Sequence, residues 1–287
     1  MIAIMLRELR AYFWSPIGYI FMGFFLLLTG FFFALNSVIP GNPRFQVVLS
    51  QIVVIFLFLV PILTMRLVAE EKKQRTDQLL LTVPVSVFGV VLGKYLAAVG
   101  VFIASLLITV LYPISLSFFG SIPVWEIIGG YIGFFLLGST FIAIGLLMSS
   151  LTENVVIAAI TTFGVLLLMF GIGWAQSAVP AGNASGLIFA GILGSLLLLW
   201  VYLATRNIFL LIGSFLLLTS LIIIVQFGVD GFYETFVMDF LAWFSLTQRF
   251  DIFFRGVLSL SSVVYFISFS VLMLFFTARV IERKRWN

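Results

Sequence analysis

The chain contains no cysteine and no histidine, and only 9% of its 287 residues are charged. It therefore has no thiolate nucleophile, no disulfide, and none of the imidazole ligands on which most zinc, copper and haem sites depend. Intramembrane metalloproteases, redox enzymes and haem carriers are disfavoured for that reason. A soluble domain is ordinarily about a quarter charged, so the scarcity of charge also argues against a water-soluble fold.

Apolar residues dominate what is present: 63% of the chain is hydrophobic, 34 residues are phenylalanine, and the mean hydropathy is +1.27. One soluble core of this length has no room for so many aromatic rings, so lipid is their expected solvent. We predict an all-α integral membrane protein, a polytopic helical bundle in which residues 1–287 form a single transmembrane domain. The basic residues flank apolar stretches and form no separate basic domain, so the expected partner is a lipid bilayer and not nucleic acid.

Charge-free stretches of about 20 residues, the length that crosses a hydrocarbon core, predict eight spans. They are Ile17–Ile39, Val47–Met65, Tyr95–Phe118, Ile127–Met148, Val155–Trp174, Leu187–Ala204, Ile208–Phe227 and Val257–Ala278. The long charge-free stretch 154–205 is divided at 175–183, where proline, glycine and asparagine indicate a loop. A re-entrant element there is the alternative, and six crossings would then be the next choice.

The distribution of basic residues predicts the orientation. Of the 15 lysines and arginines, only Arg44, Arg249 and Arg255 fall on the side opposite to both termini. Because basic residues accumulate on the cytoplasmic side, both termini are expected in the cytoplasm, which requires an even number of spans. The first apolar run has no small-residue cleavage site and is expected to remain as an anchor. By these boundaries no span contains a charged residue, which disfavours a proton-coupled carrier.

The cytoplasmic loop 66–94 is the most informative segment. Glu71 and Arg75 stand four residues apart in the order that favours a helix, and the charged run passes directly into three leucines before Pro84 interrupts the helix. A helix that docks in a groove of a partner needs apolar anchors with a charged rim, so docking is favoured. The alternative is that the leucines dip into the lipid headgroups.

The stretch Ala69–Ser86, followed by Val91–Ala97, resembles the signature of type 2 ABC transporter permeases. Residues 250–260, 264–266 and 283–286 resemble the gliding-motility (GldF-like, NosY-like) branch of that family. The resemblance departs at Arg75, where the family usually has glycine, and residues 187–227 match no motif that we recognise.

The resemblance implies a permease subunit of an ATP-binding cassette exporter in the bacterial cytoplasmic (inner) membrane. A separate ABC ATPase would dock on loop 66–94 as on a coupling helix, and a second permease, identical or related, would complete the transporter. The implied docking residues are Glu70, Glu71, Arg75, Asp77, Leu79, Leu80, Leu81 and Pro84. The alternative is a membrane scaffold or assembly subunit of such a complex without a transport path of its own.

The chain is not expected to be an enzyme. Its one Gly-Lys pair, Gly93-Lys94, lacks the first glycine and the final serine or threonine of a phosphate-binding loop. No cofactor is expected in this chain, and ATP with Mg²⁺ would be bound by the partner.

Two amphipathic segments complete the predictions. Residues 1–15 are expected to form a short amphipathic helix, which the resemblance implies is an elbow helix on the inner leaflet; an ordinary charged flank is the alternative. Residues 228–256 carry a helical stripe of phenylalanines, which predicts an outer interfacial or re-entrant helix; an aromatic belt is the commoner meaning of such a stripe. The candidate outer gate consists of Phe232, Phe236, Phe240, Phe244 and Arg255.

Small residues four apart permit close helix approach, and packing within the chain is the preferred explanation for them. The pairs are Gly89 and Gly93, Gly129 and Gly133, and Ala190 and Gly194.

Overall fold

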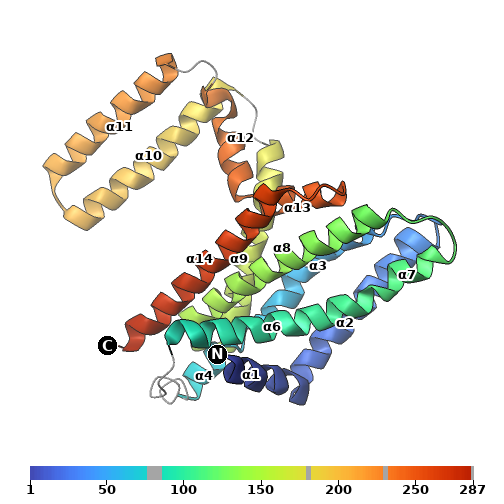
Figure 1. Ribbon diagram of the computed structural model, residues 1–287. Helices are drawn as coiled ribbons and strands as arrows, with labels where there is room; N and C mark the ends of the chain where they lie inside the picture. Colours follow the sequence, from blue (N-terminus) through green and yellow to red (C-terminus); the bar gives the residue numbers. More distant parts are fainter. Residues whose placement is uncertain (76–85, 179–181, 229–231, 286–287) are drawn as a thin grey trace. The chain divides into compact units, whose positions relative to one another are not determined.

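The computed structural model describes residues 1–75, 86–178, 182–228 and 232–285, and the elements assigned within these ranges are all helices (Figure 1). They are α1 (Ile2–Trp14), α2 (Pro16–Phe33), the π-helical turn η1 (Ala34–Val38), α3 (Gln46–Thr64), α4 (Ala69–Lys73), α6 (Val87–Thr109), α7 (Leu111–Ser117), α8 (Val124–Leu151), α9 (Val155–Ala178), α10 (Asn183–Thr205), α11 (Ile208–Gly228), α12 (Phe232–Phe244), α13 (Leu246–Phe254) and α14 (Leu260–Arg285).

Seven helical stretches among the described residues are long and apolar enough to cross a membrane. They are Pro16–Val38, Gln46–Lys73, Val87–Ser117, Val124–Leu151, Val155–Gly173, Ala184–Leu203 and Leu260–Arg283. Each overlaps one of the eight predicted spans, so a polytopic helical membrane protein is confirmed. The remaining span falls on α11, where the apolar helix within the described residues is the shorter Ile208–Ser220. The count of eight stays a prediction.

The predicted start of the third span, at Tyr95, is wrong, and the error changes the placement of Lys94. The span predicted from Tyr95 begins earlier, because Ser86 caps a helix that starts at Val87: its hydroxyl accepts a hydrogen bond from the Gly89 backbone N–H at 3.2 Å. Lys94 therefore lies on α6, inside an apolar helical stretch. The expectation that no span holds a charged residue is corrected accordingly.

The chain divides into two compact units, residues Met1–Leu168 with Leu246–Asn287, and residues Met169–Ser245. At the centre of the first unit α2, α3, α6 and α8 all contribute fully buried phenylalanines, among them Phe25, Phe56, Phe102 and Phe134. The ring of Phe56 lies 4.9 Å from that of Phe102 and 5.4 Å from that of Phe134, between centroids. Some of the phenylalanines thus form a packed core inside the protein. Contacts between their rings stabilise the fold in addition to the stabilisation from burying apolar area.

Close helix contacts in the first unit use the predicted small residues. A Cβ added at Gly133 would lie 2.7 Å from the Phe253 side chain, and one at Gly93 would lie 3.1 Å from Ile4. Packing within the chain therefore explains these two glycines. Gly194 differs, because a Cβ there would meet nothing within 4 Å.

Helices α8 and α14 run parallel. Early in α8, Gly133 lies against Phe253, and farther along α8 the hydroxyls of Thr140 and Ser270 are 3.0 Å apart. The carboxyl ends of α8 and α14 therefore point the same way. Figure 1 shows α1 and the end of α14 on that side of the first unit. The placement of both termini on the cytoplasmic side stays a prediction.

In the second unit α10 and α11 form an antiparallel hairpin (Figure 1), turned by Arg206 in the left-handed conformation at φ 50°. Helix α12 packs on α10, where a Cβ at Gly186 would lie 2.0 Å from the Tyr233 carbonyl oxygen. Only 6% of the most apolar part of α10 is buried. Such exposure of apolar helices fits contact with lipid. The helix expected within residues 228–256 is present as α12 and α13, interrupted at Ser245.

Gly138 provides a test of the aromatic core. A Cβ there would lie 2.5 Å from the Phe102 ring and 2.9 Å from Phe56. We expect Gly138→Ala to lower the free energy of unfolding by about 1–3 kcal/mol, because the rings must shift within a packed core. The control is Gly164→Ala on α9, where nothing lies within 4 Å. It should be neutral or stabilising by up to about 1 kcal/mol. Thermal unfolding in lipid nanodiscs measures both, and an equal effect of the two variants would contradict the packing described.

Candidate coupling site

The predicted docking residues lie partly within the described chain. Glu70 and Glu71 are on α4, and Arg75 follows it. The remaining five, Asp77, Leu79, Leu80, Leu81 and Pro84, fall outside the described residues. The site is therefore built from the beginning of the loop and the helices that hold it.

The beginning of the loop is bound to the carboxyl end of α8. The hydroxyl of Ser149 accepts hydrogen bonds from the backbone N–H groups of Val68, at 3.2 Å, and Ala69, at 3.1 Å, and donates one to the Met65 carbonyl at 3.0 Å. The ammonium of Lys72 donates to the Ser150 carbonyl. Because these groups are buried, each bond satisfies a polar group that would be costly to leave unpaired. Helix α4 is thereby fixed to α8.

Four charged side chains connect α1, α4 and α6. Lys94 is 2% exposed, and its Nζ lies 2.7 Å from Oε1 of Glu71 and 3.2 Å from Oε1 of Glu8. Arg7 contacts the same carboxylates, with its Nη2 2.5 Å from Glu8 and 3.2 Å from Glu71. We call these four residues the ionic cluster. Two cations face two carboxylates, so the buried ammonium is neutralised, without which its burial would be strongly unfavourable.

Helix α1 is packed into the bundle near this cluster. The buried hydroxyl of Tyr12 donates to the Leu63 carbonyl at 2.6 Å, which joins α1 to the end of α3. Burial raises the pKa of Tyr12, so the phenol stays protonated and continues to donate. The hydrogen bond to Glu8 raises the pKa of Arg7, which keeps its charge.

Sequence reasoning found Glu71 but missed its partners. Lys94 was considered in the Gly-Lys pair and in the family signature 91–97, and Arg7 and Glu8 lie in the segment 1–15 that was predicted to be amphipathic; none of the three was paired with Glu71. The available signal was a lysine followed by an uninterrupted apolar stretch, since a cation inside a membrane helix ordinarily has a partner.

Arg75 occupies a position where glycine fits better. Its φ of 57° is left-handed, and its N–H bonds to the Lys72 carbonyl at 3.1 Å, which ends α4. A side chain disfavours this conformation, whereas glycine adopts it readily. The glycine that the resemblance leads us to expect at this position would make the same turn without strain.

The candidate gate residues are divided between the units. The four phenylalanines lie on α12 in the second unit, and Arg255 follows α13 in the first. The rings of Phe236 and Phe240 contact Phe189 of α10, with centroids 6.3 and 5.4 Å away. At these two positions the stripe packs within its own unit.

Comparison with known families shows to which family the chain belongs. Residues 13–209 match the model of a family described as "ABC-2 family transporter protein", which is more than half of the chain. The chain belongs to the ABC-2 transporter family. No curated protein gives a significant match.

An ABC-2 protein is the transmembrane permease subunit of an ABC transporter, distinct from the nucleotide-binding domain, and it associates with an ABC ATPase subunit. The matched region contains α4 and Lys94, whereas Arg7 and Glu8 precede it. It also extends through α10, a segment for which the sequence alone showed no recognisable motif.

Lys94→Met tests the ionic cluster. We expect it to destabilise the permease by about 3–5 kcal/mol, because two carboxylates would face one remaining cation in a buried site. Adding Glu8→Gln should recover part of this loss, since Arg7 and Glu71 then remain as one pair. Thermal unfolding in nanodiscs is the measurement.

The control for Lys94 is Arg279→Met, which removes an exposed pair with Glu282, 3.1 Å apart. Its expected cost is below about 1 kcal/mol. A Lys94 variant no less stable than the Arg279 variant would show that the cluster contributes little.

Proposed function

We propose that this ABC-2 permease is an exporter subunit. An ABC ATPase docks on loop 66–94, and the loop transmits the movement of the ATPase to the transmembrane helices. The observation that supports this proposal is the attachment of the loop's beginning to three helices. Ser149 and Ser150 tie it to α8, and Glu71 ties it to α1 and α6 through the ionic cluster. A solvated connection would have no reason to be held so firmly.

This attachment gives a docked ATPase a mechanical route. Force on the segment 76–85 would reach α4 directly and pass to the carboxyl end of α8 through Lys72 and Ser149. It would reach α6 through the contact between Glu71 and Lys94. Rigid helices joined by buried charge and hydrogen bonds transmit displacement better than flexible chain does.

The rest of the proposal follows the same scheme. ATP and Mg²⁺ would be bound by the ATPase, and a second permease, identical or related, would face this one across the transport path. The chain would lie in a bacterial inner membrane with both termini in the cytoplasm, as a member of the GldF-like branch. The phenylalanine stripe of α12 would form the outer gate.

The proposed topology is testable by cysteine labelling, because the chain has no cysteine of its own. We expect Arg44→Cys to react with a membrane-impermeant maleimide in intact cells. Arg75→Cys and Arg206→Cys should react only after permeabilisation, because both positions are predicted to be cytoplasmic. Labelling of Arg75→Cys from outside would invert the topology. Labelling of Arg206→Cys from outside would mean that α10 and α11 do not both cross.

Docking is testable by combining Leu79→Asp, Leu80→Asp and Leu81→Asp. We expect this variant to insert in the membrane but to lose copurification with the cognate ATPase, because three carboxylates cannot enter an apolar groove. The matched control is Leu151→Asp, an exposed leucine that ends α8 on the same side. It should retain the ATPase.

Intact copurification of the triple variant would contradict docking on this loop. If the ATPase is lost but substrate distribution in cells is unchanged, the chain is a scaffold and the exporter proposal fails.

A further inference from the structure

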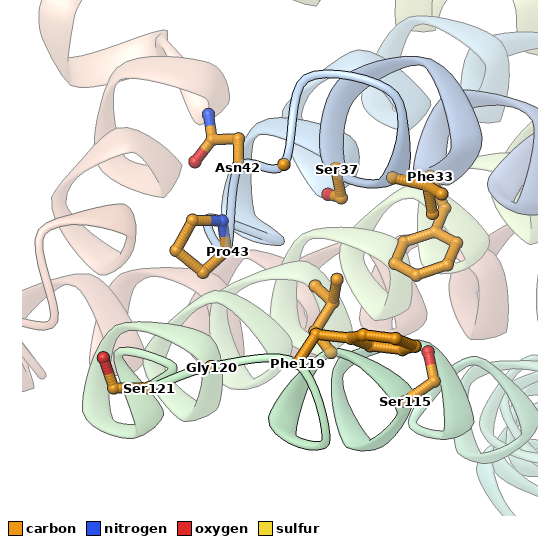
Figure 2. A pocket seen from close by; sticks show the side chains of 11 residues that line it. Phe33, Ser37, Asn42, Pro43, Ser115, Phe119, Gly120 and Ser121 are labelled. Carbon is orange, nitrogen blue, oxygen red and sulfur yellow. The ribbon is translucent and has the colours of Figure 1, made fainter.

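A pocket of about 560 Å³ lies at the end of the first unit away from α4. It is formed where α2 passes through η1 into the loop before α3, and where α7 ends (Figure 2). Its volume falls within the range of about 300–1,000 Å³ typical of small-molecule sites. Five of the residues that line it carry the argument: Phe33, Ser37, Asn42, Ser115 and Phe119.

Ser37 is the most unusual of these residues. It lies in the π-helical turn η1 and is fully buried, and its hydroxyl has no hydrogen-bond partner among the described residues. Buried hydroxyls are nearly always paired, so an unpaired one at a pocket is explained by a ligand or water. Single π-helical turns also occur frequently at functional sites.

Other polar groups of the lining have hydrogen-bonding capacity to spare. Ser115 donates its hydroxyl proton to the Tyr112 carbonyl at 2.7 Å, which leaves its oxygen free to accept. The side-chain oxygen of Asn42 accepts from the Arg44 backbone N–H at 3.1 Å, while its amide nitrogen makes no bond within the described chain. Donors and acceptors are therefore both present, as a hydroxyl-bearing ligand requires.

Two phenylalanines provide apolar faces. The Phe33 ring is held by stacking on Tyr112, with centroids 4.9 Å apart. Phe119 is 90% exposed, so it contributes little to packing and its ring is available to a ligand. None of the lining residues is charged, so an ionic ligand would lose its hydration without gaining a partner.

We propose that this pocket binds a neutral, hydroxyl-bearing ring such as a sugar, either soluble or as the headgroup of a lipid. The aromatic faces would contact the apolar faces of the ring, and Ser37, Asn42 and Ser115 would exchange hydrogen bonds with its hydroxyls. This inference goes beyond the proposed function, because it needs neither ATPase docking nor export.

The test uses the full chain in phosphatidylglycerol nanodiscs made without glycoside detergents. Saturation-transfer NMR with methyl β-D-glucoside measures binding of the soluble form, and methyl β-D-glucuronide is the charged comparison. Binding of the glucoside but not the glucuronide is expected if the soluble sugar is the ligand. Native mass spectrometry of nanodiscs doped with glucosyl diacylglycerol measures retention of the lipid form. Retention of that lipid without glucoside binding would assign the pocket to a lipid headgroup.

Ser37→Ala and Phe119→Ala should each weaken binding on the order of fivefold to tenfold in whichever form binds. The controls are Ser117→Ala, whose hydroxyl bonds to the Ile114 carbonyl at 2.7 Å, and Phe118→Ala, whose side chain is 82% exposed outside the pocket. Both should bind as the unchanged chain does. Ser37→Ala should also leave Tm unchanged or higher, because it removes an unpaired buried group, so weaker binding cannot be attributed to unfolding.

Three results would overturn the proposal. One is that neither methyl β-D-glucoside nor glucosyl diacylglycerol shows saturable binding. Another is equal binding of glucoside and glucuronide. The third is weakening by Phe118→Ala as large as that by Phe119→Ala.

Discussion

Neutralisation of the Lys94 ammonium is the interaction on which the arrangement of the coupling site depends. An ammonium that is 2% exposed needs carboxylates within about 3 Å, because its burial would otherwise cost several kcal/mol. Those carboxylates come from Glu8 on α1 and Glu71 on α4, which are distant in sequence. The requirement therefore fixes where both helices meet α6. A single buried charge thus connects three elements, in addition to the hydrogen bonds that join α4 to α8 and α1 to α3.

The aromatic core of the first unit satisfies a second requirement, the close packing of helices in lipid. Between lipid-exposed helices there is little hydrophobic driving force, so close packing must hold them together. Large rings such as Phe56 and Phe102 fill the centre, and the absence of a side chain at Gly138 leaves room for both. Gly133 does the same for Phe253. Among the described residues of α10 in the second unit little is buried, and a Cβ at Gly194 would meet nothing within 4 Å. Its apolar residues are suited to contact lipid.

Composition and charge placement were sufficient to predict much of the fold. Runs without charge located the spans, because a bilayer requires about 20 apolar residues, and seven of them coincide with helices in the structure. The start of α6 was misplaced because Lys94 was treated as a boundary, whereas tertiary partners allow it inside the helix. Those partners could not be found from the sequence, since Glu8 and Lys94 are 86 residues apart and no local pattern connects them. The Ser37 pocket was missed for the same reason: its residues come from two separate segments, 33–43 and 115–121, and carry no motif.

The two ends of the first unit differ in the chemistry that they present, and the same helices join them. Helix α6 carries Lys94 near its beginning and continues through α7 to Ser115 at the pocket. Helix α2 follows α1, which carries Arg7 and Glu8, and ends in η1 with Ser37. The ionic cluster and the pocket are therefore joined by consecutive helices, from α1 to η1 and from α6 to α7. Paired charge holds the helices together at the first end, whereas the hydroxyl of Ser37 at the second end has no partner among the described residues.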